Sequence, residues 1–280
     1  MKVHISMDME GVAGVAAGAD TTLGAPHYEY CRRLMTGECN AAIAGCFDAG
    51  AAEVVVNDSH GTMLNLLQEE LDERARVVRG RPKPLGMMQA LDRGMDATLF
   101  IGYHAAAGHG DGVLNHTMRG RDLLRVSLNG EMAGELRLNA AMAGWHGVPV
   151  ALVSGDDVVC REARETLPGT GVVEVKEAID KYTALSLHPG RARQAIRQGA
   201  ASALERLAEI RPYRVDPPFA LRIEWSSTSI ASWCEGVPGV KRVSPREVEY
   251  VSSDYPEVYR LLRVLLMVAS ASTGTPHSYD

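Results

Sequence analysis

The sequence predicts an α/β fold with three layers, in which helices cover both faces of a mostly parallel central sheet and an α/β subdomain follows at the C-terminal end. Two observations lead to this class. Short apolar runs alternate with longer segments of helical periodicity through the first half of the chain, as they do when helices connect parallel strands. With 280 residues, of which 46% are apolar, the chain can bury one large core or two modest ones.

Strands are expected where short aliphatic runs end at Gly, Asn, Asp or Ser. The first run begins almost at the N-terminus, and a later one should turn at Asn129-Gly130, a dipeptide that favours tight turns. The expected strands are residues 3–7, 53–57, 76–78, 97–102, 121–129, 148–154, 172–175, 220–224 and 248–251.

Helices are expected in the longer segments between these runs. The first long helix should stop at Gly50, because glycine readily adopts the left-handed conformation common at helix C-termini. Asp156 or Asp157 is expected to cap the helix that follows the strand at 148–154, since a carboxylate accepts N–H groups of a first helical turn. The expected helices are residues 28–49, 64–73, 85–91, 134–144, 158–167, 191–210 and 256–271.

The chain is expected to divide into two parts that pack as one domain overall. Residues 1–157 should form the α/β core, and residues 158–280 should form a C-terminal α/β subdomain packed on that core. Pro212, Pro217 and Pro218 mark a turn-rich joint in the second part. This joint is shorter and less polar than a linker between independent domains.

Composition excludes several classes of partner. A formal net charge of -6 and an isoelectric point near 5.9 argue against nucleic acid and against an anionic membrane surface, which both need a basic footprint. The five cysteines are odd in number and form no C-x-x-C, so neither a disulfide framework nor a cysteine-rich zinc site is expected. The chain enters a strand at once, and its apolar run at 261–269 contains Arg263, so a cytoplasmic protein without a membrane anchor is expected.

Two carboxylates mark the end of the first expected strand. Asp8 and Glu10 are two residues apart, and such residues share a face of a strand with roughly 6–7 Å between their Cα atoms. A core strand cannot hold two anions cheaply, so these groups should be solvated, paired with cations or bound to a metal.

Other residues able to bind a metal follow the other expected strands. His60 comes after the strand at 53–57 and His104 after the strand at 97–102, while Glu135 opens an expected helix. The carboxyl ends of parallel strands line one crevice, so these groups should meet Asp8 and Glu10 there. Three carboxylates and two imidazoles suit zinc, manganese or cobalt, and five ligands suit two ions about 3.5–4 Å apart, with Asp8 as the natural bridge.

Each of these residues also has a purely structural explanation. Asp8 and Glu10 could bond to neighbouring amides, His60 could cap the helix expected at 64–73, and His104 could be a satisfied core histidine. Glu135 could serve only the helix N-terminus, where the macrodipole favours an acid.

A glycine-rich loop at residues 105–118 presents two further histidines. His116 is the candidate for catalysis, because an imidazole near neutrality can take a proton from water, act as a nucleophile or protonate a leaving amine. The alternative for His116 is a solvated loop residue, which is the expected fate of His109.

Five motifs together resemble the D-aminopeptidase family, peptidase family M55, closely from residue 1 to about residue 157 and more weakly beyond it. They are Ser6-Met-Asp-Met-Glu-Gly11, Asn57-Asp-Ser-His60, Gly102-Tyr-His104, His116-Thr-Met118 and Gly134-Glu-Leu136. The resemblance implies a binuclear zinc aminopeptidase with two Zn²⁺ per subunit, and a ring-like homo-oligomer, a decamer. It places Asp8, Glu10, His60, His104 and Glu135 as the metal ligands and His116 in catalysis.

The expected reaction releases an N-terminal amino acid from a short peptide or amino acid amide, and the preference for D residues rests on the resemblance alone. The metal pair would activate a water and polarise the carbonyl, while an ion or carboxylate receives the α-amine. One rival is another metal-dependent amide or phosphoester hydrolase, although no Arg or Lys stands close to the proposed ligands in the sequence apart from Arg119 and Arg121 after His116. The other is a catalytically silent, metal-binding oligomeric scaffold.

Overall fold

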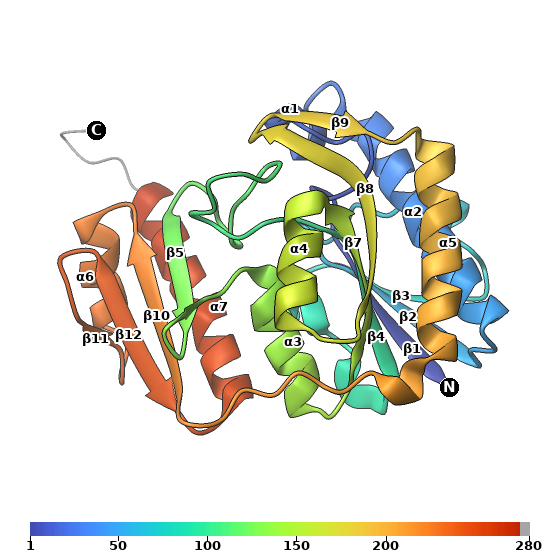
Figure 1. Cartoon of the computed structure of the whole chain (residues 1–280). Helices are drawn as coiled ribbons and strands as arrows, with labels where there is room; N and C mark the ends of the chain where they lie inside the picture. The colour runs from blue at the N-terminus through green and yellow to red at the C-terminus, as the bar shows by residue number, and fades with distance from the viewer. Residues whose placement is uncertain (275–280) are drawn as a thin grey trace.

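A mostly parallel sheet of seven strands lies at the centre of the computed structural model, which describes residues 1–274 (Figure 1). The strand order is β3-β2-β1-β4-β7-β8-β9, and all neighbours are parallel except β9, which runs antiparallel to β8. The strands are β1 (Lys2–Met7), β2 (Glu53–Asp58), β3 (Arg76–Val78), β4 (Ala97–Tyr103), β7 (Val150–Asp156), β8 (Gly171–Asp180) and β9 (Thr183–Ser186). The predicted α/β class is confirmed.

The neighbouring strands β2, β1 and β4 end within two residues of one another. Met7, the last residue of β1, pairs with Asp58 of β2 on one side and with Ile101 of β4 on the other. The chain segments that leave these three strands therefore start side by side at one edge of the sheet. This register positions the candidate site.

Helices cover both faces of this sheet (Figure 1). Helices α2 (Tyr28–Asp48) and α5 (Pro189–Glu205) pack together on one face, over alternate apolar residues of β1 such as Ile5 and Met7. Helices α3 (Glu135–Trp145) and α4 (Asp157–Thr166) lie on the other face. Asp156 caps α4, as the sequence predicts, by accepting the N–H of Val159 at 2.8 Å.

A second, antiparallel sheet stands beside the first, with the order β11-β12-β10-β5-β6. Its strands are β5 (Leu123–Leu128), β6 (Glu131–Met132), β10 (Phe219–Trp225), β11 (Lys241–Arg242) and β12 (Glu247–Ser252). Helices α6 (Thr228–Glu235) and α7 (Tyr255–Gly274) pack with it, and α7 also contacts α3. Phe219, Trp225 and Tyr259 are buried in the core that joins this sheet to the α3 face of the first sheet.

The predicted division at residue 157 does not coincide with the division between the two sheets. β8, β9 and α5 follow residue 157 but belong to the first sheet and its helical cover. β5 and β6 precede it but belong to the second sheet. The physical reason is edge pairing: β5 pairs with β10 rather than with the parallel sheet, a long-range contact that local periodicity does not reveal.

Two predicted helices are wrong. Only a 3₁₀ turn at Gln68–Glu70 forms within 64–73, because the Asp58 carboxylate binds the N–H groups of Asn65 and Leu66 and ties this segment to the end of β2. In place of the helix at 85–91 the chain makes one 3₁₀ turn at Gly86–Met88 and a second that begins at Leu91 (Leu91–Arg93), since Ala90 between them takes a left-handed conformation with φ of 78°.

Other elements were not predicted from the sequence at all. These are α1 (Gly18–Thr21), β6, β9, α6 and β11. The helix predicted at 191–210 ends earlier, at Glu205, and a 3₁₀ turn at Leu207–Glu209 follows it. Across residues 1–274, no helix combines the length and the apolar character needed to cross a membrane.

Candidate metal centre

The turn after β1 carries the first two predicted ligands. β1 ends at Met7, so Asp8 and Glu10 lie in the following turn and not on one face of a strand, which corrects the local conformation expected from the sequence. The turn crosses directly over the end of β4. A Cβ on Gly11 would lie 1.9 Å from the Tyr103 carbonyl oxygen, and a Cβ on Gly102 would lie 2.3 Å from the Asp8 carbonyl oxygen. Only glycine permits this close approach of two backbones.

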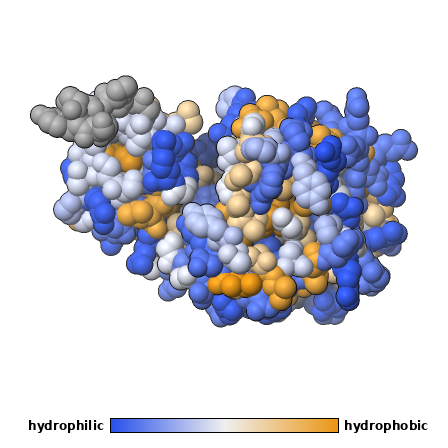
Figure 2. All heavy atoms as spheres, turned by 90° about the horizontal axis from the view of Figure 1, so that it is seen from above, coloured by the Kyte–Doolittle hydropathy of each residue, from blue (hydrophilic) through white to orange (hydrophobic). Residues whose placement is uncertain are grey.

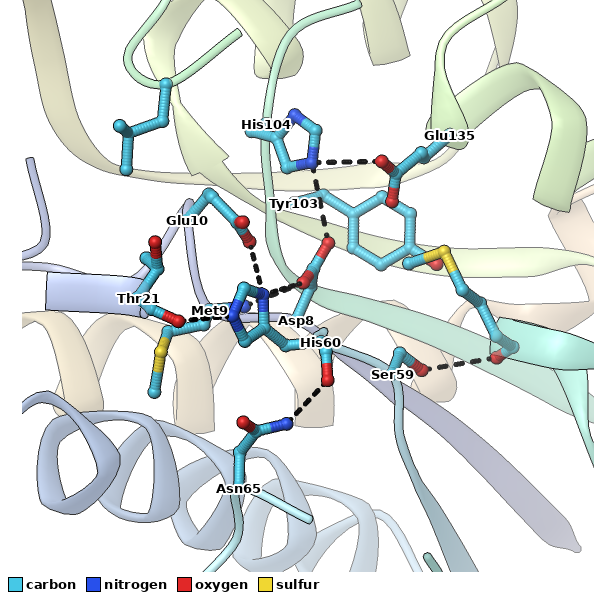
Figure 3. Close-up of polar contacts among 12 residues, drawn as sticks. Asp8, Met9, Glu10, Thr21, Ser59, His60, Asn65, Tyr103, His104 and Glu135 are labelled. Atoms are coloured by element: carbon cyan, nitrogen blue, oxygen red, sulfur yellow. Dashed lines mark hydrogen bonds and ion pairs between the residues drawn. The ribbon is translucent and has the colours of Figure 1, made fainter. Parts of the chain in front are cut away.

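His60, which follows β2, faces both of these carboxylates (Figure 3). Its Nδ1 lies 2.9 Å from Glu10 Oε2 and 3.4 Å from Asp8 Oδ1. Its other ring nitrogen, Nε2, lies 2.9 Å from the carbonyl oxygen of Thr21 and donates to it. This bond fixes the ring and leaves Nδ1 as the nitrogen available to a cation.

His104 and Glu135 approach from the opposite side (Figure 3). His104 directly follows β4, and its Nε2 lies 3.6 Å from Asp8 Oδ2 and 3.3 Å from Glu135 Oε1. Its Nδ1 donates to the Ala105 carbonyl oxygen at 3.0 Å, so Nε2 is the free nitrogen. Glu135 is the first residue of α3, as predicted, and also accepts the N–H of Met118 at 2.7 Å.

His116 lies on the open side of the cluster. Its Nε2 is 3.8 Å from Glu10 Oε1 and 3.8 Å from Glu135 Oε1, and its ring stacks on His104 with centroids 4.2 Å apart. Its Nδ1 donates to the Leu114 carbonyl oxygen at 2.9 Å. The side chain of His116 is 20% exposed, more than the predicted ligands. By contrast, the imidazole of His109 contacts the backbone of Asp111 within its own loop.

All six candidate residues therefore meet at one place, and the charges there are strongly coupled. Burial and the neighbouring Glu10 raise the pKa of Asp8 to about 7. Burial alone would lower the pKa of His104, but the carboxylates of Glu135, Glu10 and Asp8 together outweigh it and raise that pKa to about 10. Burial and His104 lower the pKa of His116, so this imidazole is neutral at pH 7. The carboxylates thus attract positive charge. In the protein without a metal, that charge comes from His60 and His104, whose raised pKa values favour their protonated forms.

The donor set fits a divalent cation of the zinc type. Asp8 Oδ2 and His104 Nε2 face each other and are buried without a hydrogen-bond partner within residues 1–274. Ligand atoms of Asp8, Glu10 and His104 lie within 4.8 Å of one another, and so do those of His104, His116 and Glu135. Buried polar atoms without partners are costly, and carboxylate and imidazole donors suit zinc.

A buried lysine that the sequence analysis missed supports the turn after β1. Lys176 of β8 points its ammonium under this turn and donates to the carbonyl oxygens of Glu10, Val12 and Val15, the last two at 3.1 and 2.6 Å. Its only sequence signal is a single lysine directly after the strand predicted at residues 172–175.

A polar network also lies beneath the site and links the two sheets. Tyr103 donates to Ser6 Oγ at 2.8 Å, and Asn139 of α3 donates to the Tyr103 hydroxyl at 2.9 Å. Tyr259 of α7 in turn donates to Asn139 Oδ1 at 2.7 Å. Ser6 and Tyr103 belong to the first and third of the sequence motifs, whereas Asn139 and Tyr259 belong to none of the five.

A cavity of about 710 Å³ opens beside His60, at the end of the molecule where the surface is hollowed between the two sheets (Figure 2). Arg81, Arg119 and Arg263 are among its lining residues, and we call it the arginine pocket. The expectation that no Arg or Lys beyond those following His116 lies near the ligands is therefore wrong. Folding brings Arg81 and Arg263 there from distant parts of the chain.

An α/β fold with a buried carboxylate–imidazole cluster at the carboxyl ends of its strands defines the class of metal-dependent hydrolases. The family model described as D-aminopeptidase matches residues 1–264. The D-aminopeptidase of Bacillus subtilis is 34% identical over 270 residues, covering 96% of this chain and 98% of that protein. The chain belongs to the D-aminopeptidase family, as the sequence motifs predicted.

A solved structure supports the same relationship. It is described as the Zn-dependent D-aminopeptidase DppA from Bacillus subtilis, a self-compartmentalizing protease. It superposes with a TM-score of 0.93 at 34% identity and covers 96% of this chain and 98% of its own. The expectation of an aminopeptidase with a three-layer α/β fold is thereby confirmed.

Proposed function

We propose that this chain is a zinc-dependent aminopeptidase that releases N-terminal D-amino acids from short peptides or amino acid amides. The observation that carries the proposal is the facing pair of buried ligand atoms, Asp8 Oδ2 and His104 Nε2, which have no hydrogen-bond partner within residues 1–274 and lie in a cluster of acids and imidazoles. Zinc dependence and D-specificity are described for the similar Bacillus subtilis protein, which supports the same assignment here.

Five residues would hold two zinc ions per subunit: Asp8, Glu10, His60, His104 and Glu135. Asp8 would contribute both of its carboxylate oxygens, since Oδ1 faces His60 and Oδ2 faces His104. When bound, such ions supply Lewis-acid chemistry, which lowers the pKa of a water and polarises a carbonyl.

His116 would act as the catalytic base or nucleophile. Its Nδ1 proton is engaged by the Leu114 carbonyl, so Nε2 is the basic atom, and it faces the cluster from the exposed side. Its lowered pKa keeps it unprotonated near neutral pH, which a proton acceptor requires. The acids of the cluster would receive the free α-amine of the substrate and so select an N-terminal residue.

Self-association is part of the proposal. The similar structure is described as self-compartmentalizing, and we propose a homo-oligomer, a decamer, with a cytoplasmic location. The β8–β9 hairpin exposes Ile179, Tyr182 and Leu185, each more than 60% accessible, which is typical of a surface buried by another subunit. Light scattering coupled to size exclusion gives the number of chains; a monomer at all concentrations would exclude this part.

A second candidate function, phosphoester hydrolysis, is favoured by one observation, the three arginines beside His60. A panel of D- and L-aminoacyl amides together with p-nitrophenyl phosphate separates the two functions. We expect zinc-dependent turnover of the D-aminoacyl amides. Turnover of the phosphate alone would replace the proposed function with the second one.

A further inference from the structure

The arginine pocket carries an unusual excess of positive charge. Three of its lining residues are arginines, and no Asp or Glu lines it among the residues that the structure describes. Partial burial and the charges of Arg263 and Arg119 lower the pKa of Arg81, so the three cations lie within reach of one another's field. Cations that repel each other in one cavity favour binding of an anion.

Two of the three guanidinium groups are held in place by the protein. Arg119 donates through Nε and Nη2 to the buried Asp122 carboxylate at 2.8 and 2.5 Å. Arg263, from α7, donates through Nη1 to the carbonyl oxygens of Lys83 and Pro84. Each therefore keeps donors free in a fixed orientation, and such preorganised arginines bind planar oxyanions well.

Arg81 differs because it has no such anchor. It forms no ion pair and no side-chain hydrogen bond with any residue in the range 1–274. Asp122 cannot neutralise it, since that carboxylate is already shared by Arg119 and Arg121. Among residues 1–274, Arg119 alone of the three pairs with a carboxylate, Arg263 donates only to carbonyl oxygens, and Arg81 has neither contact.

The position of the pocket relates it to the metal centre. His60 lines the cavity while its Nδ1 faces Glu10 and Asp8, and Met118, whose N–H binds Glu135, also lines it. Acidic groups therefore border one end of this space and cationic groups another. A short peptide has the complementary pattern, with an ammonium at one end and a carboxylate at the other.

We infer that the arginine pocket binds the free α-carboxylate of a short peptide whose amino end lies at the carboxylate–imidazole cluster. This inference rests on the proposed aminopeptidase function and names its substrate class: di- and tripeptides with an unblocked C-terminus. A cavity of about 710 Å³ accommodates a few residues, and the apolar walls at Met87 and Leu266 fit small side chains. Arg81, Arg119 and Arg263 are then specificity-determining residues.

The test compares D-alanylglycine with its C-terminal amide, D-alanylglycinamide, in the zinc-loaded enzyme. We expect the wild type to have a KM about 10-fold or more lower for the acid, since a charge-assisted hydrogen bond contributes that much. Arg81→Gln and Arg263→Gln should raise the KM for the acid to that of the amide, with kcat and the KM for the amide changed less than about twofold. Arg81→Lys should keep part of the preference.

Arg260→Gln is the matched control, because Arg260 is an exposed arginine on α7 that does not line the pocket. Arg81→Gln removes no described contact, so a folding defect does not obscure its result. Equal KM values for acid and amide in the wild type, or an equal loss for both in the variants, would overturn the inference.

A binding measurement separates this inference from the proposed function. Calorimetry would use D-alanylglycine analogues in which a methylene-amine replaces the scissile amide, in acid and amide forms. Tighter binding of the acid, lost in Arg81→Gln, would support the inference even if the enzyme hydrolysed no peptide. Equal binding of both forms, or turnover of p-nitrophenyl phosphate that depends on Arg81 in place of peptide turnover, would overturn it.

Discussion

His104 Nε2 and Asp8 Oδ2 lie 3.6 Å apart, and neither has a hydrogen-bond partner within the described part of the chain. The two atoms come from residues 96 positions apart in the sequence, yet each directly follows a strand of the same sheet. A cation bound between two facing ligand atoms of this kind would stabilise both, because burial keeps water from them. The other four residues of the cluster surround this pair.

Replacement of His116 by alanine should abolish most turnover while zinc content stays near that of the wild type. Five other side chains remain to hold the metal, whereas no other imidazole within residues 1–274 faces the cluster from its open side. The expected loss is roughly 10²–10⁴-fold in kcat, the usual contribution of a general base. Metal analysis alongside steady-state kinetics checks this, and a variant that loses its zinc would instead make His116 a ligand.

Gly102→Ala should damage the site, whereas Gly147→Ala should not. Both glycines have nearly the same backbone conformation, with φ of 73° and 72°. A Cβ at position 102 would lie 2.3 Å from the Asp8 carbonyl oxygen, but a Cβ at position 147 meets nothing within 4 Å. We expect a cost of about 1 kcal/mol for Gly147→Ala and of roughly 3 kcal/mol or more for Gly102→Ala.

Thermal unfolding and zinc content measured on both variants separate the strain of the left-handed conformation from the collision with the turn. If the two variants lost equal stability and bound equal zinc, the close approach of the two backbones would have no energetic role.

Glu38→Gln should remove a pH dependence of stability. Burial raises the pKa of Glu38, on α2, to about 7, while one oxygen accepts the N–H of Ala13 and the other has no partner among residues 1–274. Between the unfolded pKa near 4.3 and the folded value, the native state holds a proton that the unfolded state has lost. Stability therefore falls as pH rises through this window.

The glutamine variant should be more stable than the wild type at pH 8 by about 1–3 kcal/mol and show a smaller loss from pH 5 to 8. Chemical denaturation of the zinc-loaded proteins at several pH values measures this. Parallel pH profiles for the two proteins would show that Glu38 is ionised throughout.

The sequence reveals the sheet and the convergence of the site because both follow from local signals. Asp8, His60 and His104 each follow a short aliphatic run, and parallel strands end at one edge. The helices predicted at 64–73 and 85–91 were wrong for two reasons. The Asp58 carboxylate binds the backbone of the first segment, and the left-handed conformation of Ala90 interrupts the second.

Long-range pairing is what local periodicity cannot reveal. β5 pairs with β10, nearly 100 residues away, so the predicted division at residue 157 differs from the division between the sheets. Lys176, Arg81 and Arg263 are missed for the same reason, since each reaches the site from a segment without a motif. Proximity to the site alone identifies them.

Zinc titration of the metal-free enzyme tests the central claim most directly. Zinc would be added to protein stripped with a chelator and dialysed, and the bound metal would be measured by mass spectrometry. We predict that about two equivalents bind per chain and restore activity, and that Asp8→Asn and His104→Ala each lower the stoichiometry or the affinity. If the wild type bound no zinc, or if both variants bound it as the wild type does, the proposed metal centre would be contradicted.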